Sequence, residues 1–125
     1  MPVAERKNKK TSGTPASIRE AMKKATTEML VLYVLREKPM YTYEMMQTIE
    51  HLSDGKITFN TLYQAIYRLQ GFEYIHERGK EVSDDNRVRI YFTITASGEE
   101  YLRKLIHEYR TFTGAVDKIL TSKEL

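Results

Sequence analysis

The order of apolar and polar side chains predicts helices in the first half of the chain. Ser17 and Glu20 have the spacing of a capping box, which favours a helix that begins at Ser17. By residues 29–35 this helix is apolar on nearly every side, so we expect it to be buried. It ends before Pro39, because proline disfavours helical geometry in the residue that precedes it.

A second and a third helix follow at short spacing. The second is expected over about residues 42–52, where one apolar stripe recurs at helical intervals: Tyr41, Met45, Ile49 and Leu52. Gly55 ends it by adopting a positive φ. The third is expected from an N-cap at Thr58 to about Gly71. Its inward face comprises Leu62, Ala65, Ile66 and Leu69.

Beyond Phe72 the period changes from helical to two, which indicates a β-hairpin. In residues 87–94 one face carries Val88, Ile90, Phe92 and Ile94, and the other carries Arg87, Arg89, Tyr91 and Thr93. Residues 74–81 form the expected partner strand, and residues 83–86 have the composition of a turn.

A long last helix is expected from Thr95 to about Leu120. Its apolar positions alternate at spacings of three and four, which is typical of a coiled-coil seam: Leu102, Leu105, Tyr109, Phe112, Val116 and Ile119. Such a seam has to be covered, and the same helix of a second copy covers it best, although packing within one chain is the alternative. Gly114 allows a bend.

Three helices, a hairpin and a further helix make a mainly α fold with a small β-hairpin, the winged helix-turn-helix. We expect a flexible basic N-terminal arm at residues 1–16 and the DNA-binding winged helix-turn-helix at residues 17–95. The C-terminal dimerisation helix occupies residues 96–125.

Composition and charge narrow the function. The 125 residues carry a net charge of +3, and residues 1–24 hold seven basic against two acidic side chains. A cationic arm suits a polyanion such as DNA or an anionic membrane surface, or it serves only as a solubilising tail. The chain has no cysteine, no signal-like leader and no apolar run of bilayer length, which favours a cytoplasmic protein outside the membrane.

We expect no enzyme, no metal site and no cofactor. The three histidines lack metal-ligand spacing, and the chain has no phosphate-binding loop, dinucleotide fingerprint or nucleophile elbow.

The outward face of the third helix has the chemistry of base reading. Opposite its buried face lie Asn60, Gln64, Tyr67 and Gly71, flanked by Thr61, Tyr63 and Arg68. Amides bind adenine and arginine binds guanine in bidentate fashion, and the face has no carboxylate to repel phosphates. An ordinary polar helix surface is the alternative.

The hairpin adds cations to this face. Arg87 and Arg89 share one side of their strand, and Arg78 and Lys80 lie on the opposing strand, so the hairpin is suited to grip phosphate or enter the minor groove. Acidic neighbours of these cations make a solvated edge with salt bridges the alternative.

Three runs of the sequence resemble the PadR family of bacterial transcriptional regulators, in its short-tailed subgroup. They are residues 32–45, residues 58–69 with the segment Thr61-Leu62-Tyr63 and the pair Arg68-Leu69, and residues 89–98, which end the hairpin at Gly98. The resemblance spans about residues 25–120. It implies a homodimeric repressor that dimerises through its last helix with contacts from its first. It also implies DNA contacts by Tyr43, Thr61, Tyr63 and Arg68, with Arg87 and Arg89 in the wing, and an aromatic or cationic effector between the protomers.

The leading hypothesis is therefore a transcriptional regulator that binds double-stranded DNA as a homodimer at a palindromic promoter site. Asn60, Gln64, Tyr67 and Arg68 read bases in this hypothesis, and the hairpin arginines and the basic arm neutralise phosphate. A winged-helix adaptor that binds a protein instead of DNA is the main alternative. A ligand-sequestering or membrane-surface protein is a third hypothesis.

Overall fold

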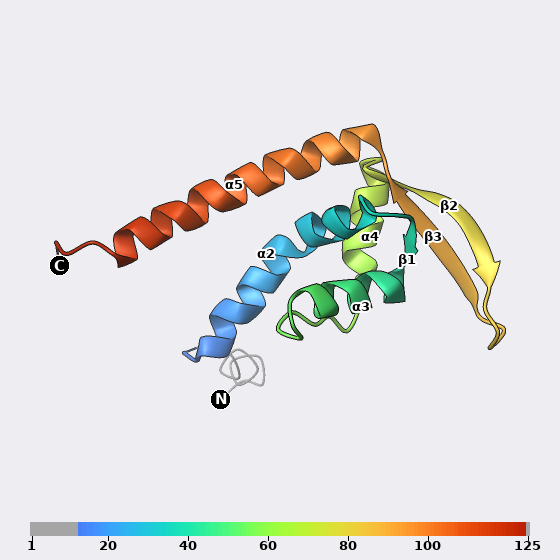
Figure 1. Cartoon of the computed structure of the whole chain (residues 1–125), viewed down its shortest axis with the longest axis horizontal. Helices are drawn as coiled ribbons and strands as arrows, with labels where there is room; N and C mark the ends of the chain where they lie inside the picture. The colour runs from blue at the N-terminus through green and yellow to red at the C-terminus, as the bar shows by residue number, and fades with distance from the viewer. Residues whose placement is uncertain (1–12, 125) are drawn as a thin grey trace, which may run out of the picture.

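The computed structural model describes residues 13–124, which form four helices and a three-stranded antiparallel sheet (Figure 1). In chain order the elements are α2 (Pro15–Leu35), β1 (Met40–Tyr41), α3 (Thr42–Leu52), α4 (Tyr63–Gly71), β2 (Ile75–Val82), β3 (Val88–Ile94) and α5 (Ala96–Leu120). The predicted winged helix-turn-helix with a long C-terminal helix is confirmed. Residues 1–12, most of the expected arm, lie outside the described residues.

The start of α2 differs from the prediction. Thr14 is the N-cap and Pro15 occupies the first turn, so the helix begins before Ser17. Proline is favoured there because its φ is already helical and its missing N–H group needs no partner. The Ser17 hydroxyl donates to the Thr14 carbonyl at 2.8 Å, and Glu20 forms an ion pair with Lys23 at 3.9 Å. The expected capping box of Ser17 and Glu20 is wrong.

The link between α3 and α4 is longer than predicted. α3 has the expected bounds, and Gly55 after it has the expected positive φ of 79°. Thr58 is not an N-cap, because α4 begins only at Tyr63 after the N-cap Leu62. Residues 53–62 form a loop in which Ile57 and Phe59 pack against the core.

The apolar faces of the two helices are buried largely as predicted. Met45 and Ile49 of α3 and the four inward residues assigned to the third helix are buried. Leu52 is the exception, since it is 63% exposed at the last turn of α3. The stripe therefore ends one turn earlier than predicted.

The sheet has one strand more than the predicted hairpin. β2 and β3 pair in antiparallel fashion, and β1 joins the free edge of β3 through the pairs Met40–Phe92 and Tyr41–Tyr91. Tyr41 was predicted on the stripe of the second helix, but it lies in β1, and its ring meets that of Tyr91 edge-on at 5.4 Å. A two-residue strand is too short to produce a period in the sequence.

The start of α5 is locked onto the turn before β2. The Thr95 hydroxyl caps the helix by accepting a hydrogen bond from the Gly98 amide at 3.0 Å, and it donates to the Glu73 carbonyl at 2.8 Å. A Cβ on Gly98 would lie 2.1 Å from the Tyr74 carbonyl oxygen. Only glycine allows this approach, so the direction in which α5 leaves the sheet is fixed by Gly98.

The predicted seam of α5 changes environment along its length. Leu102 is 2% exposed in the core, whereas Phe112 is 72% exposed. Figure 1 shows α5 continuing past the start of α2, away from the hairpin at the opposite end of the molecule. Among the described residues, no helix combines the length and apolar character that a bilayer crossing needs.

Candidate nucleic-acid interface

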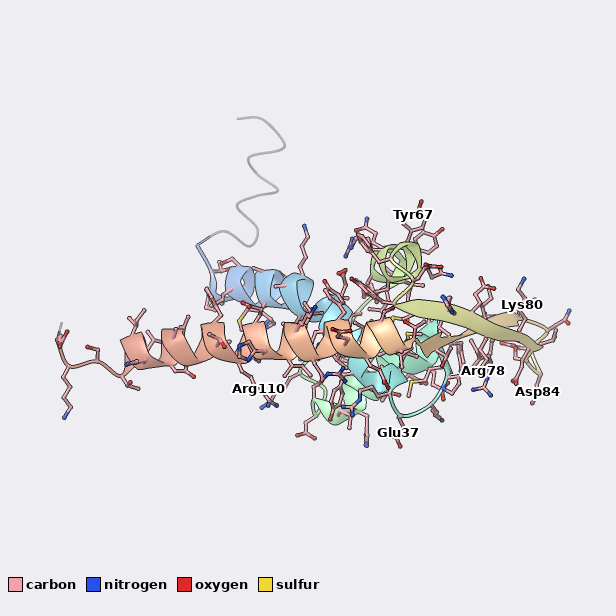
Figure 2. All side chains as sticks on the ribbon, turned by 90° about the horizontal axis from the view of Figure 1, so that it is seen from above. Glu37, Tyr67, Arg78, Lys80, Asp84 and Arg110 are labelled. Carbon is pink, nitrogen blue, oxygen red and sulfur yellow. The ribbon has the colours of Figure 1, made fainter. Side chains whose placement is uncertain are left out.

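The outer surface of α4 is open to solvent and contains no acidic residue from Tyr63 to Gly71. Tyr63, Gln64 and Tyr67 are exposed, and Tyr67, at 72%, points away from the rest of the molecule (Figure 2). Opposite them, Ala65, Ile66 and Leu69 anchor the helix in the core. The helix therefore offers two phenols, an amide and the arginine that follows them without a carboxylate to repel phosphate.

Two predicted residues of this surface are not helical. Asn60 and Thr61 are exposed in the loop before α4, because the helix starts at Tyr63 rather than after Thr58. The Thr61 hydroxyl accepts a hydrogen bond from the Tyr63 amide at 3.1 Å and so shapes the entry to α4. The placement of Asn60 on the helix face opposite Leu62 is thus wrong, whereas Thr61 lines the groove beside α4.

A groove separates α4 from the sheet. Its volume is about 460 Å³, and Tyr43 from the first turn of α3 and Thr61, Tyr63 and Tyr67 from the α4 region line it. Arg89 lines the sheet side. The groove is rich in hydroxyl groups, which bind either phosphate oxygens or base edges. Residues from α3, the α4 region and the sheet thus meet on one surface, and the surface includes Tyr43, which the family resemblance indicated.

The cations of the hairpin do not share one face. Lys80 is in register with Ile90, whereas Glu81 is in register with Arg89. Registered residues of an antiparallel pair lie on the same face, so Lys80 lies on the Ile90 side, opposite to Arg89. A bulge between Glu77 and Gly79 shifts the register near Arg78. Figure 2 shows Arg78, Lys80 and Asp84 toward the end of the hairpin.

Two of these arginines already have partners. The Nε atom of Arg87 lies 3.4 Å from the Asp85 carboxylate, as the salt-bridge alternative predicted. The Ser83 hydroxyl hydrogen-bonds to the same carboxylate, and this bond together with Arg87 lowers the pKa of Asp85. The Arg89 guanidinium stacks on the Tyr41 ring, 4.6 Å from its centroid. Within residues 13–124, Lys80 forms no ion pair, which leaves it free for phosphate.

Arg68 is held by a residue that the sequence did not indicate. Its Nε atom lies 3.4 Å from Oε1 of Glu28 on α2, forty positions earlier in the chain. No local pattern connects residues so far apart, because only the packing of α4 against α2 brings them together.

An apolar cleft lies between α2 and α5, away from the α4 surface. It has a volume of about 650 Å³ and is lined by Ile18, Met22 and Met29 of α2 and by Tyr109, Phe112 and Val116 of α5. Four of the six predicted seam residues line it: Leu105, Tyr109, Phe112 and Val116. Leu102 is buried in the core instead, and Ile119 is exposed beyond the cleft.

In this structure α3, a turn and the solvent-facing α4 are followed by the hairpin of β2 and β3. This arrangement defines the class of winged helix-turn-helix proteins that bind DNA. Residues 31–104 match the model of the transcriptional regulator PadR-like family. The match covers more than half of the chain, and the protein belongs to this family of DNA-binding transcriptional regulators.

Relatives and solved structures agree with this assignment. An uncharacterized protein of Lysinibacillus sphaericus is 29% identical over 99 residues, which cover 78% of this chain and 90% of the relative. A PadR family transcriptional regulator from Eggerthella lenta has a similar structure, with a TM-score of 0.68 and 26% identity over 86% of this chain and 89% of that one. A transcriptional regulator from Clostridium thermocellum gives a TM-score of 0.66 and 25% identity over 76% and 93% of the two chains.

Proposed function

We propose that this protein is a homodimeric repressor that binds a palindromic promoter site and releases it in response to a small aromatic or cationic effector. The observation that carries the proposal is the acid-free, exposed face of α4 on the same chain as an uncovered apolar cleft between α2 and α5. The first feature suits the major groove, and the second suits a second protomer.

Base reading is assigned to Gln64, Tyr67 and Arg68 on α4, with Asn60 beside them in the preceding loop. An amide binds adenine and a guanidinium binds guanine through pairs of hydrogen bonds, which distinguishes base pairs in the major groove. Thr61, Tyr63 and Tyr43 border the same surface and have hydroxyl groups suited to phosphate oxygens.

Phosphate neutralisation is assigned to Lys80, Arg87, Arg89 and the basic arm. Lys80 is the strongest of these candidates, because it has no ion-pair partner among the described residues, whereas Arg87 has Asp85. Each neutralised phosphate releases counterions, so binding should weaken steeply as salt increases, with a log–log slope of roughly −0.9 per contact.

Dimerisation is assigned to the seam residues Leu105, Tyr109, Phe112, Val116 and Ile119. Leu102 is left out, because it is 2% exposed in the core of its own chain. Exposed aromatic and aliphatic side chains at heptad spacing favour association, because a second surface that covers them removes apolar area from water. A two-fold axis through paired α5 helices presents two α4 surfaces to successive grooves, about 34 Å apart, and selects a site with matching symmetry.

Effector binding is assigned to the α2–α5 cleft. Methionine and aromatic side chains line it, and Glu108 and Asp117 are among its lining residues, which suits a flat apolar molecule with a positive charge. A ligand there would change the spacing of the two α4 helices. A dimer seated on a promoter competes with RNA polymerase for the same DNA, so release by the ligand relieves repression.

Selection of purified protein against random duplex DNA tests the proposal. We expect enrichment of a site whose two halves are related by symmetry and lie about one helical turn apart. Enrichment of a single asymmetric half-site would contradict the dimer. Failure to retain any duplex at low salt would overturn DNA binding and favour the protein-binding adaptor.

Two matched variants refine this test. Gln64→Ala should reduce the preference for the selected site over random DNA by about 1–3 kcal/mol. Lys80→Ala should weaken both DNAs alike and reduce the salt slope by about one, whereas Lys104→Ala on α5 should leave both unchanged. Equal loss on both DNAs for Gln64→Ala would refute its role in base reading.

A further inference from the structure

A small polar cluster links the DNA-facing helix to both walls of the apolar cleft. Glu28 comes from α2 and Arg68 from α4, and their side chains are 25% and 50% exposed. Tyr101 of α5 lies beside them and stacks on Tyr74 at 4.3 Å. Burial raises the pKa of Tyr101, and the nearby Glu28 carboxylate raises it further.

The contact between Glu28 and Arg68 uses one edge of the guanidinium only. Nε donates to Oε1 of Glu28 at 3.4 Å, and within residues 13–124 the two terminal nitrogens of Arg68 have no hydrogen-bond partner. Arg68 also lines a shallow hollow of about 250 Å³ on the outer surface of α4, together with Tyr63, Gln64 and Tyr67. The edge that remains free is the one that forms two parallel hydrogen bonds with guanine.

We propose that Glu28 is a positioning residue for sequence recognition: its carboxylate holds Arg68 by Nε so that the terminal nitrogens are presented to a base. An arginine without such a contact has many rotamers, and ordering it on DNA costs conformational entropy. Because the ion pair already restricts the Arg68 side chain in the free protein, less conformational entropy is lost when DNA binds. The inference rests on the proposed DNA-binding function and deepens it at one residue.

The placement of the acid argues against simple charge compensation. A carboxylate beside a DNA-binding helix repels phosphate, and the segment Tyr63–Gly71 has none of its own. Glu28 instead belongs to a different helix, α2, and contacts the guanidinium through Nε. Glu28 therefore lowers the affinity for any DNA by repelling phosphate, but it also orients the Arg68 guanidinium for a base. Removal of Glu28 should thus raise the affinity for random DNA and lower the preference for the operator.

The test measures the affinities of the full chain for the selected operator and for a random duplex of equal length. Glu28→Ala should raise affinity for random DNA a few-fold and lower the ratio of operator to random affinity by about fivefold or more. Glu28→Gln should retain most of that ratio, because its amide oxygen still accepts the Nε hydrogen bond. Glu20→Ala removes an acid from the same helix and is the matched control, with an unchanged ratio.

A second measurement places the effect on Arg68 itself. In an Arg68→Lys background, Glu28→Ala should change the ratio no further, while thermal unfolding confirms that all variants fold. An equal rise of both affinities in Glu28→Ala, or a further loss of ratio in the Arg68→Lys background, overturns the inference and leaves DNA binding intact. Absence of DNA binding by the unmodified chain overturns the proposed function as well.

Discussion

The two ends of α5 have the same sequence pattern and opposite environments. At its N-terminal end, Gly98 and Leu102 are buried against the turn before β2 and the core. At its C-terminal end, Phe112 and Ile119 are exposed although they continue the same seam. Figure 1 shows the reason: α5 extends beyond the winged helix-turn-helix, and of the elements that the structure describes only α2 runs beside this part of it.

The difference teaches that a heptad pattern indicates that a surface will be covered but does not specify what covers it. The first member of the seam, Leu102, is covered by its own chain. The later members line an open cleft with α2 or lie beyond it. One half of α5 should therefore control folding and the other half association, and substitutions in the two halves separate these roles.

Gly98→Ala should have the largest effect. A methyl group would lie 2.1 Å from the Tyr74 carbonyl oxygen and 2.9 Å from Cγ1 of Ile94. The start of α5 would therefore have to move away from the turn before β2. We expect a loss of about 4 kcal/mol or more in the free energy of unfolding, measured by urea denaturation. A near-normal unfolding midpoint would show that the helix start is adjustable.

Leu102→Ala should rank second. Leu102 is 2% exposed, and its truncation leaves a cavity where α5 meets the core. The expected cost is about 3 kcal/mol, within the range for a buried leucine. If the cost is below about 1 kcal/mol, this end of the helix is not part of the core.

Phe112→Ser should affect association rather than folding. Its own chain leaves Phe112 72% exposed, so the side chain contributes little to folding. Its loss should lower the dimer affinity by about 2 kcal/mol, or roughly 30-fold. Sedimentation at several concentrations measures this change. Arg110→Ser, an exposed substitution off the seam, is the control and should leave the dimer intact. A monomeric unmodified protein at micromolar concentration would contradict the dimer itself.

Gly114→Ala should have the smallest effect and the opposite sign from Gly98→Ala. Apart from the neighbouring backbone of α5 itself, no described atom lies within 4 Å of the added Cβ. Alanine stabilises an exposed helix interior by about 0.5–1 kcal/mol relative to glycine. Thermal unfolding should therefore move upward by a few degrees. A decrease would place Gly114 in a close contact with another chain.

The sequence predicted most of the fold because long periodic elements carry their own signal. The spacing of apolar residues predicted the buried stripes of α3 and α4, the alternation of β3 and the length of α5. The errors fell at element boundaries and in the sheet, where the short strand β1 was missed. Pro15 displaced Ser17 as the start of α2, and Thr58 lay in a loop because Ile57 and Phe59 pack inward.

Local spacing alone predicted the helical part of the candidate site. Gln64, Tyr67 and Arg68 could be assigned to one helix face by angle alone. The face of Lys80 depended on strand register, and the groove depended on how Tyr43 and Arg89 meet across three elements. Register and packing are long-range properties that a linear pattern does not contain.

The sequence by itself determined the winged helix-turn-helix, the acid-free helix and the apolar seam, because each depends on the periodicity of neighbouring residues. The tertiary structure decided which part of the seam is buried, which glycine is indispensable and which acid holds Arg68. Those outcomes depend on contacts between residues far apart in the chain, and such contacts exist only after the helices have packed.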